Sequence, residues 1–135
     1  MLKGFALATL CLIIGCSQSG IDVTGQENTP KIFLRDKPAN GKYIFQEALF
    51  IGELTIINGC VQLIQKDTAK PMIPSWPDYT RLIKTEDRYY IQLKSKALNF
   101  GESYHFGGAG YDVMPDTPMQ KACKTTHSWF VGDVN

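Results

Sequence analysis

Short alternating runs of apolar residues, each ended by a turn-forming residue, fill the chain from Gly52 onward. The clearest break is Asn58-Gly59, which separates residues 52–57 from residues 60–66. This pair is the strongest short signal for a β-hairpin, because both residues tolerate the positive φ angles of a type I′ turn. Helical spacing is weak throughout, so the sequence predicts an all-β fold, a small antiparallel barrel or sandwich. Further strands are predicted over residues 79–84, 88–94, 97–100, 102–106 and 127–134.

Residues 71–77 carry three prolines and predict a loop or an edge segment that includes Trp76. Proline has no N–H to donate to a neighbouring strand, so it is confined to edges, first residues and bulges of a sheet. Residues 43–50, before the hairpin, fit either a short helix or an extended lead-in.

The first sixteen residues have the pattern of a secretory signal. Lys3 precedes an uncharged apolar run over residues 5–15, and Cys16 follows it. Crossing the hydrocarbon core takes roughly twenty residues, so this run is too short for a transmembrane helix. The ending Ile13-Ile14-Gly15-Cys16 resembles the lipobox of bacterial lipoproteins. An apolar helix with a buried cysteine and secretion without lipid are the alternatives.

The lipobox resemblance implies a signal peptide over residues 1–15 and a lipid on Cys16. It also implies the outer membrane, with the periplasmic side as the default, because Ser17 stands where an Asp tends to hold lipoproteins at the inner membrane. Residues 16–42 are rich in Ser, Gly, Thr, Asn and Pro, and are predicted to form the lipidated N-terminus and a flexible tether. Within them, residues 32–34 form a short apolar run that suits an edge strand. Residues 43–135 are predicted to form one small β domain.

The predicted mature chain carries no net charge. The full chain has 14 basic and 13 acidic residues, and removal of residues 1–15 takes away Lys3, which leaves 13 of each. Proteins that bind nucleic acid usually carry a clustered basic face, so no nucleic-acid partner is predicted. The expected partners are the membrane, through the N-terminal lipid, and an envelope protein or glycan. No cofactor is predicted.

Cys60 and Cys123 remain in the predicted mature domain. An exported protein meets an oxidising compartment, where an even pair of cysteines is more often bridged than free. A metal site is the alternative, because Cys123 and His127 are four residues apart and His105 is also present. Structural zinc sites usually have two close pairs of ligands, whereas this chain has one. The disulfide is therefore favoured, and no metal is predicted.

Four motifs, spread over residues 45–134, resemble a group of small uncharacterised bacterial proteins, most of them exported. They are "GELTIINGCVQL", "PSWP", "FGESYHFGGAG" and, after Cys123, "WFVGDV". The group shares a Gly-Cys hairpin, a Trp-Pro loop, a Gly-Gly turn and a late cysteine. The resemblance implies that Cys60 and Cys123 belong to one framework, which favours their bridge, and it implies no activity. This chain departs from the group in a bulkier, more polar stretch between residues 80 and 96.

The two histidines are the candidates for catalysis. A hydrolase needs a histidine beside a nucleophile, with an acid behind it. The available residues are His105 and His127, Ser103 and Ser128, and Asp112 and Asp133. No Gly-x-Ser-x-Gly nucleophile elbow accompanies them.

Two loop-like motifs have weak functional signals. Gly107-Gly108-Ala109-Gly110 lacks the Lys-Ser or Lys-Thr of a phosphate-binding loop, so it is predicted to be a tight turn or bulge. Asp112 and Asp116 offer fewer oxygen ligands than a calcium loop usually has.

These features predict a lipid-anchored cell-envelope protein that acts as a binding or structural module and is not an enzyme. One alternative is a small envelope hydrolase that uses His105 or His127. The other is an oligosaccharide- or peptide-binding lipoprotein, with an aromatic surface around Trp76, Tyr104 and Tyr111.

Overall fold

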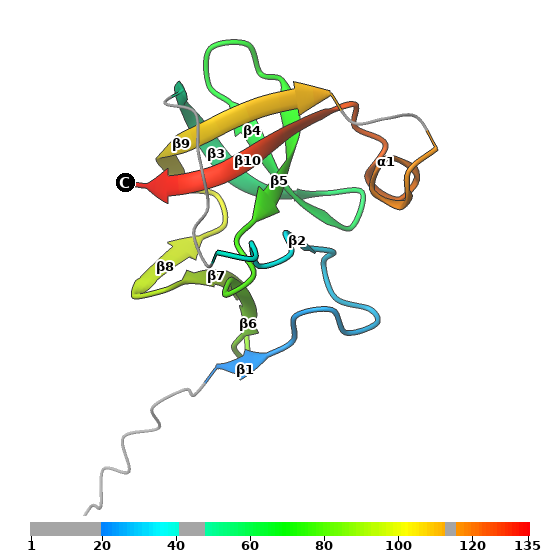
Figure 1. The fold of residues 1–135 in the computed structure, drawn as a ribbon. Coiled ribbons are helices and arrows are strands. Elements are labelled where there is room, and N and C mark those ends of the chain that lie inside the picture. The colour runs from blue at the N-terminus through cyan, green and yellow to red at the C-terminus, as the bar shows by residue number, and fades with distance from the viewer. Residues whose placement is uncertain (1–19, 41–47, 113–115) are drawn as a thin grey trace, which may run out of the picture.

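The computed structural model describes residues 20–40, 48–112 and 116–135 (Figure 1). The predicted signal peptide, Cys16 and most of the predicted lead-in over residues 43–50 lie outside the described residues. The described chain forms ten strands and one short helix. These are β1 (Ile21–Asp22), β2 (Phe33–Leu34), β3 (Ala48–Ile57), β4 (Cys60–Gln65), β5 (Pro71–Trp76), β6 (Arg81–Lys84), β7 (Tyr89–Leu93), β8 (Lys96–Asn99), β9 (Ser103–Asp112), α1 (Pro118–Cys123) and β10 (His127–Val134).

Five strands form a closed barrel, which confirms the predicted all-β fold with a small barrel. β3, β4 and β5 follow one another as antiparallel neighbours, and β9 returns to lie beside β3. This spatial order is a Greek key. β10 then pairs antiparallel with β9 and parallel with β5, so one of the five pairings that close the barrel is parallel. A five-stranded Greek-key barrel is also the architecture of the OB-fold.

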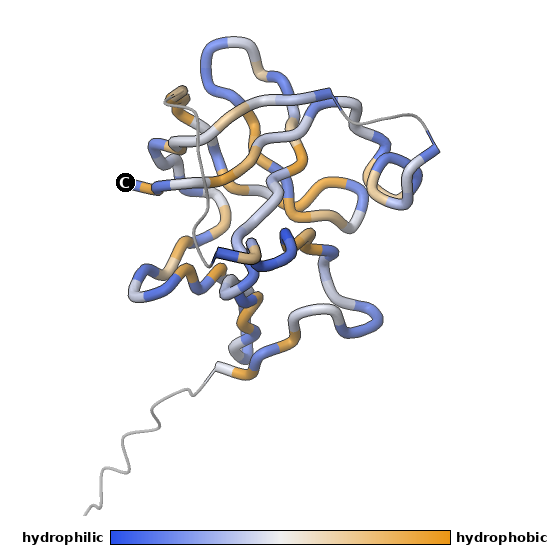
Figure 2. The backbone as a smooth tube through the Cα atoms, viewed as in Figure 1, coloured by the Kyte–Doolittle hydropathy of each residue, from blue (hydrophilic) through white to orange (hydrophobic). Residues whose placement is uncertain are grey.

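A second, smaller sheet closes one end of this barrel. It has the order β1-β6-β7-β8 and is antiparallel throughout. Leu82 and Ile91 of this sheet are fully buried in the same core cluster as Leu54, Leu63 and Phe106 of the barrel. Figure 1 shows the small sheet at one end of the molecule and the turn between β4 and β5 at the other. In Figure 2 that turn is mostly hydrophilic.

The β3–β4 hairpin confirms the turn predicted from Asn58-Gly59. Both residues have positive φ angles, 52° and 72°, and Ile57 pairs with Cys60 across the turn. These are the backbone angles that a type I′ turn requires, and Asn and Gly adopt them with little strain.

The prediction that residues 71–77 form a loop or an edge segment is wrong. Pro71 and Met72 pair with β4, residues 73–75 pair in parallel with β10, and Trp76 is fully buried. The strand tolerates Pro74 because this residue falls between the part of β5 that pairs with β4 and the part that pairs with β2. Its missing N–H therefore leaves no gap in either ladder.

Much of the predicted tether is part of the folded unit. β1 pairs with β6, β2 pairs in parallel with the edge of β5, and Val23 is buried in the core. Lys31 forms a parallel bridge with Cys60. The predicted edge strand within residues 32–34 is thus confirmed, whereas the flexible tether does not extend over residues 21–35. A few apolar and β-branched residues within this polar segment are sufficient to attach it to the domain.

Gly107–Gly110 lie inside β9, so the predicted tight turn is wrong, whereas the predicted alternative, a bulge, has a counterpart in a register shift between β9 and β10. The irregularity lies on β10, where the register with β9 shifts between Val131 and Val134. Gly108 has a φ of 145°, and a Cβ atom there would lie 1.7 Å from the carbonyl oxygen of Phe130. Glycine is needed at position 108 because the backbone of β10 lies very close to β9 at this point.

The predicted disulfide between Cys60 and Cys123 is confirmed, with a Cα–Cα distance of 5.7 Å. It joins the start of β4 to the end of α1, and both cysteines are fully buried beside Ile73. Thr117 caps the helix by accepting a hydrogen bond from the N–H of Gln120. The sequence patterns did not predict this helix, because six residues are too few to show a helical period.

Candidate functional site

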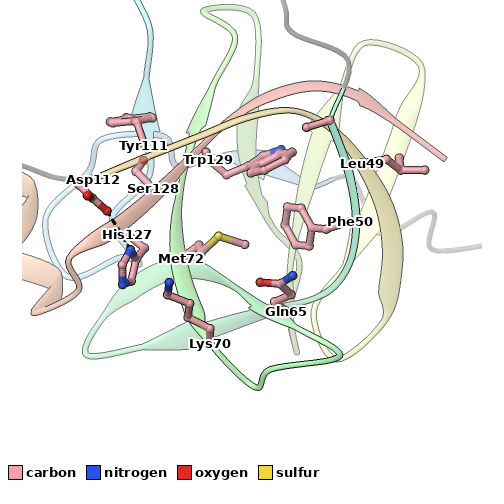
Figure 3. A pocket seen from close by; sticks show the side chains of 12 residues that line it. Leu49, Phe50, Gln65, Lys70, Met72, Tyr111, Asp112, His127, Ser128 and Trp129 are labelled. Atoms are coloured by element: carbon pink, nitrogen blue, oxygen red, sulfur yellow. Dashed lines mark hydrogen bonds and ion pairs between the residues drawn. The ribbon is translucent and has the colours of Figure 1, made fainter.

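The open end of the barrel, opposite the small sheet, holds a cavity of about 480 Å³ (Figure 3). We call it the mouth. Cavities of this size hold small ligands in proteins, and the mouths of β-barrels are among their usual places. Its walls come from the start of β3, the end of β4, the start of β5, the end of β9 and the start of β10. The lining residues are Ala48, Leu49, Phe50, Gln65, Lys70, Met72, Gly110, Tyr111, Asp112, His127, Ser128 and Trp129.

Aromatic and sulfur-containing side chains form the floor of the mouth. Phe50 and Trp129 meet edge to face, with ring centroids 4.6 Å apart, and Met72 lies beside them. All three side chains are buried. The indole Nε1 of Trp129 donates to the carbonyl oxygen of Gly107 at 3.3 Å, which fixes the ring over β9. The floor is therefore an apolar surface whose shape is set before any ligand binds.

Charged and polar side chains surround this floor. Asp112 and His127 are cross-strand partners on β9 and β10, and Asp112 Oδ1 lies 3.1 Å from His127 Nδ1. Figure 3 shows Lys70 and Gln65 along another side of the opening. Lys70 is exposed, and the side chain of Asp112 is 89% exposed. The rim thus offers a lysine cation together with a carboxylate and an imidazole.

The pairing of Asp112 with His127 realises two members of the predicted hydrolase set. The third member does not join them, because the buried hydroxyl of Ser128 donates to the carbonyl oxygen of Ile73 at 2.6 Å. Ser128 follows His127 directly on a strand, so their side chains point to opposite faces. Ser103 and His105 lie near the other end of β9, away from this pair. In the described part of the chain, no serine hydroxyl hydrogen-bonds to a histidine ring.

The predicted aromatic surface is not formed. Trp76 is fully buried and packs edge to face against Phe106 at 6.4 Å. Tyr104 packs on the same Phe106, and its hydroxyl donates to Glu102 at 2.8 Å and accepts from the N–H of Asn99. Burial raises the pKa of the Tyr104 phenol, and Glu102 adds to this shift.

Tyr111 is the one member of the predicted aromatic surface that lines the mouth. It stacks on Phe130 with ring centroids 4.2 Å apart, and the guanidinium of Arg35 lies 5.4 Å from the centroid of Phe130. This stack holds the end of β9 against β10.

Cys60 and Cys123 cannot be the ligands of the alternative metal site, because they are bonded to each other. Among the described residues, no three His, Cys, Asp or Glu side chains gather in a way that could hold a metal ion. The predicted weakness of Asp112 and Asp116 as a calcium site stays a prediction, since residues 113–115 between them lie outside the described part.

Sequence reasoning missed most of the mouth, including Phe50, Lys70, Met72 and Trp129. One signal was available. The Gly107–Gly110 run faces the start of the aromatic strand β10, and a Cβ atom on Gly108 or Gly110 would lie 2.9 or 3.4 Å from the ring of Trp129. Glycines opposite a tryptophan mark a position where a large ring lies flat over a backbone.

No family model matches the chain, and neither the curated proteins nor the solved structures contain a match to it. Within the described residues, no helix has the length and apolar character needed to cross a membrane.

Proposed function

We propose that this chain is a lipid-anchored envelope protein whose barrel binds a small peptide-like ligand at the mouth. Two observations support the location. The N-terminal pattern that ends at Cys16 resembles a lipobox, and the Cys60–Cys123 disulfide is of the kind that persists in oxidising compartments.

The side chains that line the mouth are the main support for the binding function. Its apolar floor of Phe50, Met72 and Trp129 suits a hydrophobic side chain. Lys70 suits a carboxylate, and Asp112 suits an ammonium group. A short peptide with an apolar residue carries all three groups, whereas a neutral sugar uses neither charge. The chemistry of the rim therefore favours a peptide over an oligosaccharide.

Methionine side chains provide a local reporter of binding. The mature protein, labelled with ¹³C at the methionine methyl groups and held in detergent micelles, is titrated with leucine-containing dipeptides and tripeptides. The signal of Met72 on the floor should shift, whereas that of Met119 on α1 should not. N-acetylglucosamine oligomers form the comparison series. A shift of Met72 with these sugars alone would assign the mouth to a glycan, and no shift with either series would contradict a ligand site here.

Lys70→Gln is expected to weaken peptide binding roughly tenfold or more, because a hydrogen bond to a charged group contributes about 1.5–3 kcal/mol. The matched control is Lys66→Gln. Both lysines are exposed in the β4–β5 turn, but only Lys70 lines the mouth. The dissociation constants come from the same titration. Equal losses in the two variants would show a general effect of charge and would contradict a carboxylate site at Lys70.

Cys16→Ala is expected to leave the precursor uncleaved and free of acyl label, because both the lipid and the cleavage depend on the thiol at this position. Metabolic labelling with a fatty acid and mass spectrometry of the N-terminus measure the two effects. Cys11→Ala is the control, because Leu10 before it is too large for the peptidase, and this variant should be processed normally. Normal processing and labelling of Cys16→Ala would overturn the anchor.

A further inference from the structure

We propose that one end of the small sheet rests on the headgroups of the leaflet that holds the lipid on Cys16. This end, which we call the sheet tip, consists of β1, the end of β6 and the start of β7, with Ile21, Ile83, Lys84, Tyr89 and Tyr90. The inference rests on the proposed anchor and adds a surface, a partner and an orientation to it.

The small number of residues between Cys16 and β1 carries the argument. Ile21 is five positions after Cys16, and five fully extended residue steps span at most about 18 Å. As a flexible coil, the same length reaches only about 12 Å on average. The headgroup region of one leaflet is itself roughly 5–8 Å thick. A domain attached this closely to its anchor lies against the membrane surface.

Several contacts fix the chain to the domain from Ile21 onward. Ile21 is therefore the point at which the segment after Cys16 is attached to the domain. Ile21 and Asp22 pair with Lys84 and Ile83 of β6. The N–H of Val23 donates to the carbonyl oxygen of Leu82 at 2.9 Å, and the Thr24 hydroxyl accepts from the Leu82 N–H at 2.8 Å.

Asp22 strengthens this attachment. Its Oδ1 accepts hydrogen bonds from the hydroxyl and the N–H of Thr24, at 2.7 and 3.0 Å, and these bonds lower the pKa of the carboxyl. Arg81 Nε lies 3.5 Å from its other oxygen.

The composition of the sheet tip suits a lipid surface. Ile21 is 66% exposed, and Tyr89 and Tyr90 are half-buried on opposite faces of β7. Lys84 Nζ lies 5.8 Å from the ring centroid of Tyr89. Tyrosines with a nearby lysine are favoured at membrane interfaces, because each side chain has an apolar body and a polar end.

The charges at the end of β6 and in the turn after it indicate which headgroups the tip needs. Lys84 and Arg88 are balanced by Glu86 and Asp87. The contact is therefore interfacial rather than electrostatic, so it should form on neutral headgroups and persist at high salt. The small sheet and the β4–β5 turn lie at opposite ends of the molecule (Figure 1), so the mouth then faces the aqueous side.

Depth-dependent fluorescence quenching tests this orientation in the full lipidated protein. Ile21→Trp and Leu49→Trp make a matched pair, because both residues are 66% exposed and they lie at the tip and at the mouth. Each variant is reconstituted into phosphatidylcholine vesicles with and without bromine on the upper acyl chain. The native Trp76 and Trp129 are buried, and the wild-type emission is subtracted. The emission added by Ile21→Trp should be lost in brominated vesicles, whereas that added by Leu49→Trp should be retained.

Mass spectrometry of the same samples separates the two proposals. If Cys16 is acylated but both added tryptophans are quenched equally or neither is quenched, the orientation is overturned and the anchor stands. Recovery of the Ile21→Trp emission at high salt would also overturn the interfacial contact. If Cys16 carries no acyl chain, both proposals fail.

Discussion

Gly108→Ala is expected to destabilise the barrel by about 3 kcal/mol or more, which is a large share of the stability of a small domain. The added Cβ atom would lie 1.7 Å from the carbonyl oxygen of Phe130, and the φ of 145° is one that alanine rarely adopts. Backbone on β10 has to move, and this strand carries both Trp129 and the parallel pairing with β5. Urea unfolding followed by circular dichroism measures the loss.

Gly107→Ala is the matched control on the same strand. A Cβ atom at Gly107 would come no closer than 3.4 Å to Asp133, and this glycine has no positive φ. The free energy of unfolding of the Gly107→Ala protein should therefore differ from that of the wild type by less than about 1 kcal/mol. Equal effects of the two substitutions would contradict the close approach of β10 to Gly108.

Cys60→Ser and Cys123→Ser should each lower the free energy of unfolding by about 4 kcal/mol, the value that chain entropy assigns to a loop of this size. The disulfide spans 63 positions and ties α1 to the start of β4. The double variant should lose no more than either single one, because each removes the same bond.

Reduction of the wild-type protein should produce a similar loss, and reductant should leave the double variant unchanged. Urea unfolding with and without dithiothreitol measures all four samples. Additive losses in the double variant would show that the cysteines contribute separately and would contradict the bridge as the source of stability.

Local signals predicted those parts of the fold that short-range physics decides. Asn58-Gly59 predicted its hairpin because the requirement for two positive φ angles is confined to the turn itself. The run of residues 127–134 predicted β10 with the bounds that the structure shows. The cysteine pair predicted the bridge because the chain holds no other cysteine after Cys16.

Long-range pairing decided the rest. Three prolines excluded a central strand by local rules, yet β5 is the strand that closes the barrel. Pro74 fits within β5 only because β4 pairs with the residues before it and β2 pairs with the residues after it, along the same edge of β5. Apart from the edge strand within residues 32–34, the polar stretch before β3 was predicted to be a flexible tether, yet β1 docks on a strand more than sixty residues away in the sequence.

By itself, the sequence determined that this chain is a β protein with one bridge and a lipobox-like start, because turn geometry, strand alternation and cysteine number are readable from neighbouring residues. Only the tertiary structure decided that Phe50, Lys70, Asp112 and Trp129 meet at one mouth and that strand pairing already begins at Ile21. Both depend on which strand edges pair, and strand pairing is set by contacts between residues far apart in the chain, which no local pattern records.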